Sequence, residues 1–166
     1  MSDDSRLIIQ PLNTRHDRAG FRSGVAALDT YLARQAGQDV KRRISRVFVA
    51  ASAKQPNTVL GYYTLSSLAV ELDALPPHLA RKLPRHPVPA ALLGRLAVSQ
   101  VAQGQGVGSM LLADAVKRTL SVSNEIAIYA LVVDAIDESA QGFYERFGFS
   151  LLSGEGRRLF LPLRCV

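Results

Sequence analysis

Three glycines within five positions, Gly104, Gly106 and Gly108, constrain this chain more than any other local feature. They stand between an apolar segment that ends at Val98 and a run whose apolar residues recur at helical spacing. Glycine lets the backbone approach a ligand closely, and the first N–H groups of a helix point outward without an intrahelical partner. The helix dipole adds about half a positive charge at that end. The turn therefore predicts an anion-binding site between a strand and a helix.

Two common phosphate-binding motifs do not fit this turn. A P-loop carries a lysine directly after its last glycine, whereas Gly108 is followed by Ser109 and Met110. The dinucleotide fingerprint G-x-G-x-x-G needs a third glycine where Ser109 stands, and it usually follows an early strand. The alternative without a ligand is a glycine-rich turn that only packs the helix on the strand. Taken alone, the turn leaves the anion unidentified.

Hydrophobic periodicity along the rest of the chain predicts alternating strands and helices. Strands are expected over 7–11, 46–53, 59–68, 91–98, 126–133, 149–152 and 158–163. Helices are expected over 25–40, from Pro77, from Gly106 and over 139–146. The turn between 46–53 and 59–68 contains Pro56 and Asn57, which favours a hairpin. This order is typical of an α/β domain around a mixed sheet.

Three details of these elements are more specific. The helix after the glycines carries an apolar stripe, which we expect to face the core: Met110, Leu111, Leu112, Ala115, Val116 and Leu120. The continuous apolar run over 126–133 predicts a central strand covered on both faces. Ser139 stands near the expected cap of the helix over 139–146, and the last two strands are expected to flank Gly154 and Gly156.

Composition limits the class of protein. The 166 residues suit a single domain spanning 1–166, with 48% hydrophobic and 20% charged residues. The start is acidic rather than basic, unlike a signal peptide, and no apolar run approaches the ~20 residues of a membrane span. One cysteine, Cys165, has no partner for an internal disulfide, and the three histidines (His16, His78 and His86) lack the spacing of metal ligands. A cytoplasmic protein that binds neither membrane nor metal is expected.

A net charge of +6 is compatible with a phosphorylated cofactor or a nucleic acid. The positive residues gather in two segments, around Arg34 to Arg46 and around Arg81 to Arg95. Charge alone does not establish such a partner, because many basic domains bind no RNA.

Two motifs together make the chain resemble the GNAT acetyltransferases. The first is Gln103-x-x-Gly106-x-Gly108 after Leu96-Ala97-Val98; the second runs from Asp137 to Phe149 and contains Phe143-Tyr144 and Gly148-Phe149. The resemblance implies a mixed sheet of about six to seven strands, flanked by helices. Its parallel strands over 92–98 and 126–133 would splay apart.

The same resemblance implies acetyl-coenzyme A as cosubstrate, with its pyrophosphate on the glycine turn and its pantetheine arm along the strand edge. The residues it assigns to the cofactor are Leu96, Ala97, Val98, Gln103, Gly104, Gln105, Gly106, Val107, Gly108, Ser109 and Asp137. A backbone N–H near Val98 would stabilise the oxyanion. Tyr144 would donate a proton to the departing thiolate, because a phenol with pKa of about 10 is protonated at neutral pH. The alternative for Tyr144 is simple packing among Phe143, Phe147 and Phe149.

No general base stands out from the residues. Glu125, Asp134 and Glu145 are candidates, although a solvated surface charge explains each of them. An α-amine, with a pKa of about 8, would need less help from a base than a lysine amine with a pKa of about 10.4.

The first half of the chain resembles the GNAT toxins of bacterial toxin–antitoxin modules, over 16–24, 28–32, 34–38, 46–49, 61–65 and 83–98. This resemblance implies acetylation of the α-amino group of aminoacyl-tRNA, a block of translation, silencing by a ribbon-helix-helix antitoxin and a possible homodimer. Candidate RNA-binding residues are Arg34, Arg42, Arg85 and Arg95. Two alternatives stay open: an N-acetyltransferase of a small amine or protein N-terminus, and a degenerate domain that only binds coenzyme A or a partner.

Overall fold

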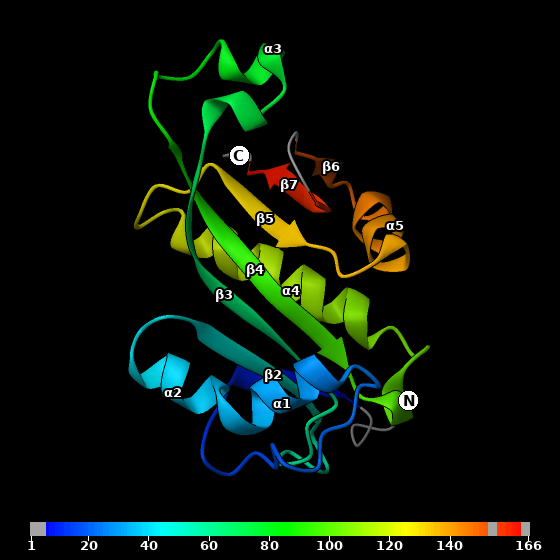
Figure 1. Cartoon of the computed structure of the whole chain (residues 1–166). Coiled ribbons are helices and arrows are strands. Elements are labelled where there is room, and N and C mark those ends of the chain that lie inside the picture. The colour runs from blue at the N-terminus through cyan, green and yellow to red at the C-terminus, as the bar shows by residue number, and fades with distance from the viewer. Residues whose placement is uncertain (1–5, 153–155, 164–166) are drawn as a thin grey trace. The chain divides into compact units, whose positions relative to one another are not determined.

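The computed structural model describes residues 6–152 and 156–163, so the expectations at Gly154 and Cys165 lie outside the described residues. The strands are β1 (Leu7–Pro11), β2 (Arg46–Ser52), β3 (Gly61–Val70), β4 (Val88–Val98), β5 (Ala130–Asp134), β6 (Ser150–Leu151) and β7 (Arg158–Pro162). The α-helices are α1 (Ala26–Arg34), α2 (Ala36–Lys41), α3 (Pro77–Ala80), α4 (Val107–Val122) and α5 (Glu138–Arg146). Two 3₁₀ turns, η2 (Leu72–Ala74) and η3 (Gln100–Ala102), precede α3 and α4 (Figure 1).

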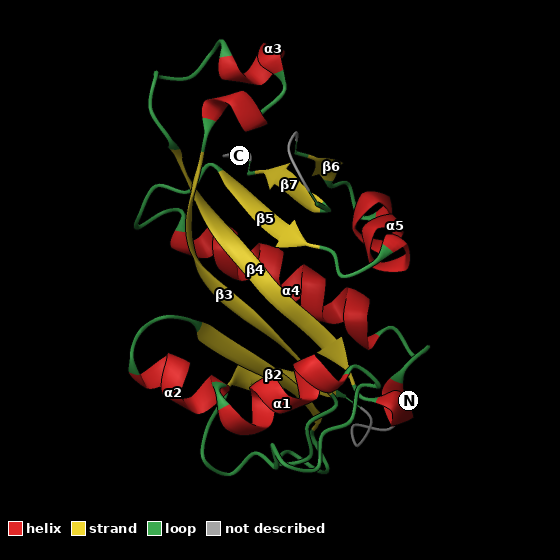
Figure 2. Ribbon diagram, viewed as in Figure 1, coloured by secondary structure: helices red, strands yellow, loops and turns green. Residues whose placement is uncertain are grey.

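The strands form one mixed seven-stranded sheet in the order β1-β2-β3-β4-β5-β7-β6, which confirms the expected α/β fold flanked by helices (Figure 2). The hairpin is confirmed, since β2 and β3 pair antiparallel from Arg46↔Leu65 to Ala50↔Gly61. The parallel pair is β4 with β5, in register from Ala90↔Ala130 to Leu93↔Val133. Because β4 continues to Val98, its last five residues run on beyond this pairing.

The described residues divide into two compact units. The first combines 6–66 with 94–116, and the second combines 67–93 with 117–152 and 156–163. Both β3 and β4 therefore contribute one part to each unit.

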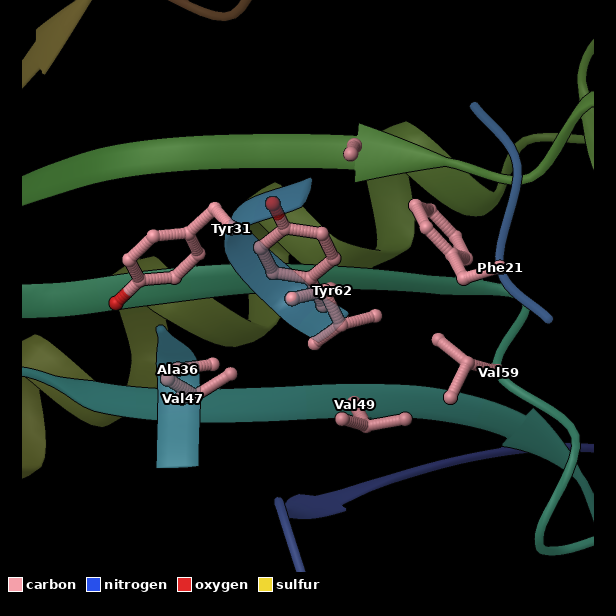
Figure 3. Close-up of a cluster of buried hydrophobic side chains, with 9 residues drawn as sticks. Phe21, Tyr31, Ala36, Val47, Val49, Val59 and Tyr62 are labelled. Atoms are coloured by element: carbon pink, nitrogen blue, oxygen red, sulfur yellow. The ribbon is translucent and has the colours of Figure 1, made fainter. Parts of the chain in front are cut away.

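The core of the first unit lies between α1, α2 and one face of β2 and β3. Its members come from the N-terminal loop, both helices and the strands (Figure 3): Phe21, Tyr31, Leu32, Ala36, Val47, Val49, Val59, Tyr62 and Ala97. Tyr62 points toward α1, where its hydroxyl donates to the carbonyl oxygen of Leu28 at 2.6 Å. The neighbouring Gly61 faces the other way, because a Cβ there would meet the Leu111 side chain of α4 at 2.8 Å. This alternation is the period of a strand with helices on both faces.

The second unit has its own core. Its buried residues lie on β3, directly after η2, on β4, on β5 and in the β6–β7 hairpin region: Val70, Leu75, Val88, Ala90, Ala130, Val132, Leu152 and Phe160. All four central residues of β5 from Ala130 to Val133 are buried, as expected for a strand covered on both faces.

Two helical expectations need correction. The predicted helix over 25–40 is two helices separated at Gln35, whose φ of −116° leaves the helical range. The Tyr31 hydroxyl on α1 still donates to Asp39 on α2 at 2.8 Å, so both helices serve one core. The cap of α5 is Asp137 rather than Ser139, because the Asp137 carboxylate accepts the N–H of Ala140 at 2.8 Å.

The start of one predicted strand and the burial of three apolar residues were also wrong. The predicted strand over 126–133 begins only at Ala130, because the Ile126 N–H bonds to the Val122 carbonyl oxygen and prolongs the turn that ends α4. Ile126 is 65% exposed. On α4, Leu111, Leu112 and Ala115 are buried as expected, whereas Met110 and Leu120 are exposed. Thr119 is buried instead of Leu120, since the inward face follows every fourth residue from Leu111.

Candidate active site

The end of β4 and the glycine turn are joined by the Gln103 side chain. Its Nε2 donates to the carbonyl oxygens of Ser23 at 2.8 Å and Val98 at 3.0 Å. A further bond runs from the Gln100 N–H to the Arg22 carbonyl oxygen at 2.8 Å. The turn is therefore anchored both to the strand before it and to the loop that precedes α1.

The backbone of the turn explains its glycines. Gly104 and Gly106 have φ values of +80° and +83°, a region that residues with a side chain rarely adopt. A Cβ at either position would meet no atom within 4 Å. The space over both glycines is thus open on the protein side, as a close ligand approach requires. Gly108 differs from these two, because it lies inside the first turn of α4.

Helix α4 begins directly after this turn. The first N–H bond along the helix runs from Met110 to the Gly106 carbonyl oxygen at 3.1 Å. The amides of Val107, Gly108 and Ser109 precede that bond, where helices leave their N–H groups without intrahelical partners. A 16-residue helix also directs its positive dipole end at this point. The turn can hold a doubly charged phosphate group without a lysine.

Leu96, Ala97 and Val98 end β4, beyond its parallel pairing with β5. Ala97 is buried, while Leu96 and Val98 are half-buried. Directly after Val98, the N–H of Ser99 bonds to the Leu60 carbonyl oxygen, in the loop before β3. The strand end is thus held in its unit by the loop before β3.

Tyr144 lies on α5 in the second unit, with only 5% of its surface exposed. Its ring packs edge-on against Phe143 and Phe149, at centroid distances of 5.3 and 5.7 Å. No described residue forms a hydrogen bond with its hydroxyl. Burial, with a smaller effect of Asp134, raises the pKa of Tyr144 to about 12. The phenol is therefore protonated at neutral pH.

The candidate general bases differ in their surroundings. Asp134 forms a bidentate pair with Arg158, at 2.7 Å from Nε to Oδ1 and 2.9 Å from Nη2 to Oδ2. The hydrogen bond to Asp134 and its negative charge raise the pKa of Arg158. Glu125 and Glu145 are exposed, as expected for surface charges.

Asp137 has a structural function that the sequence did not reveal. Its Oδ1 is engaged with the Ala140 N–H at the start of α5. A carboxylate at this position satisfies one of the free helix amides and interacts favourably with the dipole.

The four candidate arginines are not equivalent. The Arg95 guanidinium lies 3.6 Å from the centroid of the Tyr31 ring, a cation–π contact, and its backbone N–H bonds to Thr64 Oγ1. Arg34 and Arg42 are exposed at the ends of α1 and α2 in the same unit. Arg85 is exposed in the loop before β4 and belongs to the second unit.

Sequence reasoning missed Tyr31. This residue supports Arg95 with its ring and bonds Asp39 with its hydroxyl. The only signal was its position three residues after Leu28 on the apolar face of a helix.

A comparison with protein families matches residues 43–151 to the acetyltransferase (GNAT) domain. The chain belongs to the GNAT acetyltransferase family. Family membership agrees with the mixed sheet, its β4–β5 parallel pair and the glycine turn before α4.

Three relatives of this GNAT chain are toxins described with tRNA, acetyl-CoA or an antitoxin. A tRNA-acetylating toxin of Mycobacterium tuberculosis is 35% identical over 148 residues, which cover 89% of this chain and 87% of the relative. The structure of AtaT complexed with acetyl-methionyl-tRNAfMet is 34% identical, covers 95% of both chains and has a TM-score of 0.88. A mutant AtaT toxin bound to acetyl-CoA and the C-terminus of the antitoxin AtaR is 32% identical, with a TM-score of 0.80 and coverage of 94% and 92%.

Two further observations concern the described part of this GNAT chain. None of its helices has the length and apolar character that a membrane span requires. Its described residues also contain no group of three or more His, Cys, Asp or Glu side chains arranged to hold a metal ion.

Proposed function

We propose that this chain is an acetyl-CoA-dependent toxin that acetylates the α-amino group of aminoacyl-tRNA and so blocks translation. The observation that carries the proposal is the likeness to AtaT complexed with acetyl-methionyl-tRNAfMet, which extends over 95% of the chain. The open glycine turn and the protonated Tyr144 supply the two chemical features that such a reaction needs.

The glycine turn is proposed to bind the pyrophosphate of acetyl-CoA. Its support is that a Cβ on Gly104 or Gly106 would enter only open space, which a ligand can fill. The amides of Gln103 to Ser109 would face the pyrophosphate, and the edge of β4 at Leu96, Ala97 and Val98 would bond the pantetheine arm. When bound, acetyl-CoA supplies an acetyl group activated as a thioester. Asp137, which caps α5, is proposed as a further contact of the cofactor.

Tyr144 is proposed as the general acid. A phenol with a pKa of about 12 holds its proton at neutral pH and would donate it in a hydrogen bond to the thiolate, whose thiol has a pKa of about 8.5, while the C–S bond breaks. The proton lost by the attacking amine then balances the proton gained by the thiol. A backbone N–H near Val98 would stabilise the oxyanion that forms at the acetyl carbon. We assign no side chain as general base, because an α-amine is partly neutral at pH 7.

The nucleic-acid substrate is supported by charge. Arg34, Arg42 and Arg95 in the first unit, and Arg85 in the second, are proposed to contact tRNA phosphates. Arg95 is held by its stacking on Tyr31, which reduces the conformational freedom lost on binding.

Several wider properties belong to the same proposal. The antitoxin would be a ribbon-helix-helix protein whose tail covers the toxin, and the toxin would form a homodimer in the cytoplasm. The whole chain, residues 1–166, would act as one acetyltransferase domain. Co-expression with a neighbouring ribbon-helix-helix protein, followed by size-exclusion chromatography, tests the partner and the dimer together.

The deciding experiment combines purified protein, labelled acetyl-CoA and charged tRNA. The label is expected on the α-amino group of the aminoacyl ester, and hydrolysis of that ester should release N-acetyl amino acid. Uncharged tRNA is the matched control, because it lacks the amine. Transfer to a small amine or a peptide N-terminus but not to aminoacyl-tRNA would establish the first alternative function. Binding of acetyl-CoA without any transfer would establish a degenerate domain.

A further inference from the structure

A basic cavity lies in the first unit, and none of the residues proposed for catalysis lines it. Its volume is about 340 Å³, which is within the range of small-ligand pockets. It is bounded by the loop after β1 and by the facing sides of α1 and α2. Three cationic side chains line it, Arg18 from the loop, Arg34 from the last turn of α1 and Lys41 from the last turn of α2.

A glycine in helix α2 makes room for the Arg18 side chain. A Cβ at Gly37 would lie 2.7 Å from Nη1 of Arg18, so the guanidinium occupies the space that a side chain at position 37 would need. Arg18 is half-buried, whereas its neighbours Asp17 and Ala19 are exposed. Glycine costs stability inside a helix, and here it provides the room for a cation.

Among the described residues, no carboxylate neutralises the positive charge in the cavity. No acidic residue lines the cavity, and none of the described carboxylates pairs with Arg18, Arg34 or Lys41. The two acidic residues closest in sequence to these three cations form hydrogen bonds with other groups. Asp17 accepts the N–H of Gly20, and Asp39 accepts the hydroxyl of Tyr31.

We propose that this cavity binds a backbone phosphate of the RNA substrate through Arg18, Arg34 and Lys41. The inference rests on the proposed function, because it assigns a second contact region to the same substrate. A guanidinium presents paired N–H donors that match the oxygens of a phosphate, and a partly desolvated cation gains more from such a partner than an exposed one. RNA is favoured over an acidic peptide because one phosphate group offers several oxygens on a single centre, which the cations that line one cavity can share.

The test measures binding of labelled deacylated tRNA to the full chain over a series of salt concentrations. In the variant R18Q/R34Q/K41Q, affinity at low salt should fall about tenfold or more, and the slope of log K against log salt should decrease by about 2 to 3. The variant R6Q/R15Q/K117Q is the matched control, since it removes the same charge from exposed positions outside the cavity. It should retain both affinity and slope to within a small factor.

A second variant, Gly37→Ala, keeps every charge. Alanine should favour helix α2, while its Cβ displaces the flexible end of Arg18. We expect unchanged or higher thermal stability together with weaker tRNA binding. If the triple variant fails to fold, Gly37→Ala decides alone, and unchanged tRNA affinity would overturn the inference.

The outcomes separate this inference from the proposed function. If the protein acetylates aminoacyl-tRNA but R18Q/R34Q/K41Q binds tRNA like the control variant, the cavity is not an RNA site. If the triple variant loses binding to its antitoxin and keeps binding to tRNA, the cavity belongs to a protein partner and the RNA inference also fails. If the triple variant loses tRNA binding while no aminoacyl-tRNA is acetylated, the inference holds and the proposed reaction does not.

Discussion

The side-chain amide of Gln103 donates a 3.0 Å hydrogen bond to the carbonyl oxygen of Val98, so the glycine turn is tied to the last residue of β4. The same amide nitrogen bonds the Ser23 carbonyl oxygen at 2.8 Å. One side chain therefore fixes the distance between the proposed pantetheine edge and the proposed pyrophosphate cradle. Both regions would contact the same acetyl-CoA molecule.

Replacing Gln103 with Glu should weaken acetyl-CoA binding. A carboxylate cannot donate to two carbonyl oxygens, and its charge would oppose the pyrophosphate. We expect KM for acetyl-CoA to rise about tenfold, with a smaller change in kcat, because a lost hydrogen bond to a half-buried carbonyl is worth about 1 to 2 kcal/mol. Steady-state kinetics and calorimetric binding of coenzyme A check this. Unchanged affinity for acetyl-CoA and coenzyme A would show that the Gln103 hydrogen bonds do not organise the glycine turn.

Gly106→Ala should impair acetyl-CoA binding with little effect on the core. The φ of +83° strains an alanine by about 1 kcal/mol, and the new methyl group would stand where the pyrophosphate is proposed to approach. Gly142→Ala is the control, since Gly142 lies in α5 at a negative φ. Thermal melting and the KM for acetyl-CoA are measured for both variants, and we expect a raised KM only in Gly106→Ala. Equal KM values in both variants would argue against the cradle.

Tyr144→Phe should lower kcat by about 10²- to 10⁴-fold, the usual contribution of a general acid. Phenylalanine keeps the ring contacts with Phe143 and Phe149, so the melting temperature should stay close to that of the parent chain. The pKa of about 12 also predicts that activity does not decline through the neutral range because of this group. A variant with full turnover would leave Tyr144 only its packing function.

Asp137→Ala should destabilise the protein by about 0.5 to 2 kcal/mol through loss of the α5 cap. Asp137→Ser restores a cap with a neutral acceptor and should recover most of that stability. Chemical denaturation measures both variants. If the serine variant recovers stability but not affinity for coenzyme A, Asp137 contacts the cofactor in addition to capping the helix.

His16 predicts a loss of stability at low pH. The ring is buried, its Nδ1 accepts the Asn13 N–H at 3.1 Å, and burial together with Arg18 lowers the pKa of His16 from 6.5. The folded state therefore takes up this proton less readily than the unfolded state. The stability that neutral His16 contributes to the folded state is complete above about pH 6.5. It is lost as the pH falls through the lower pKa that His16 has in the folded state. His16→Gln should flatten the dependence of unfolding free energy on pH in that window.

The sequence by itself determined the elements and the chemistry that local rules control. Glycine spacing before an apolar helix marked the anion-binding turn, because positive φ and free helix amides are properties of a short segment. Pro56 and Asn57 in the connecting turn marked the β2–β3 hairpin for the same reason. The family motif around Tyr144 marked the candidate acid.

Only the tertiary structure decided which side chains meet. The stacking of Arg95 on Tyr31, the pair between Asp134 and Arg158 and the bond from Gln103 to Ser23 join residues 24 to 80 positions apart. The solvent exposure of apolar side chains was also decided by the tertiary structure. Ile126 looked like core in the sequence, yet the turn at the end of α4 directs it to solvent. Such contacts depend on how whole elements pack, and no local periodicity contains that information.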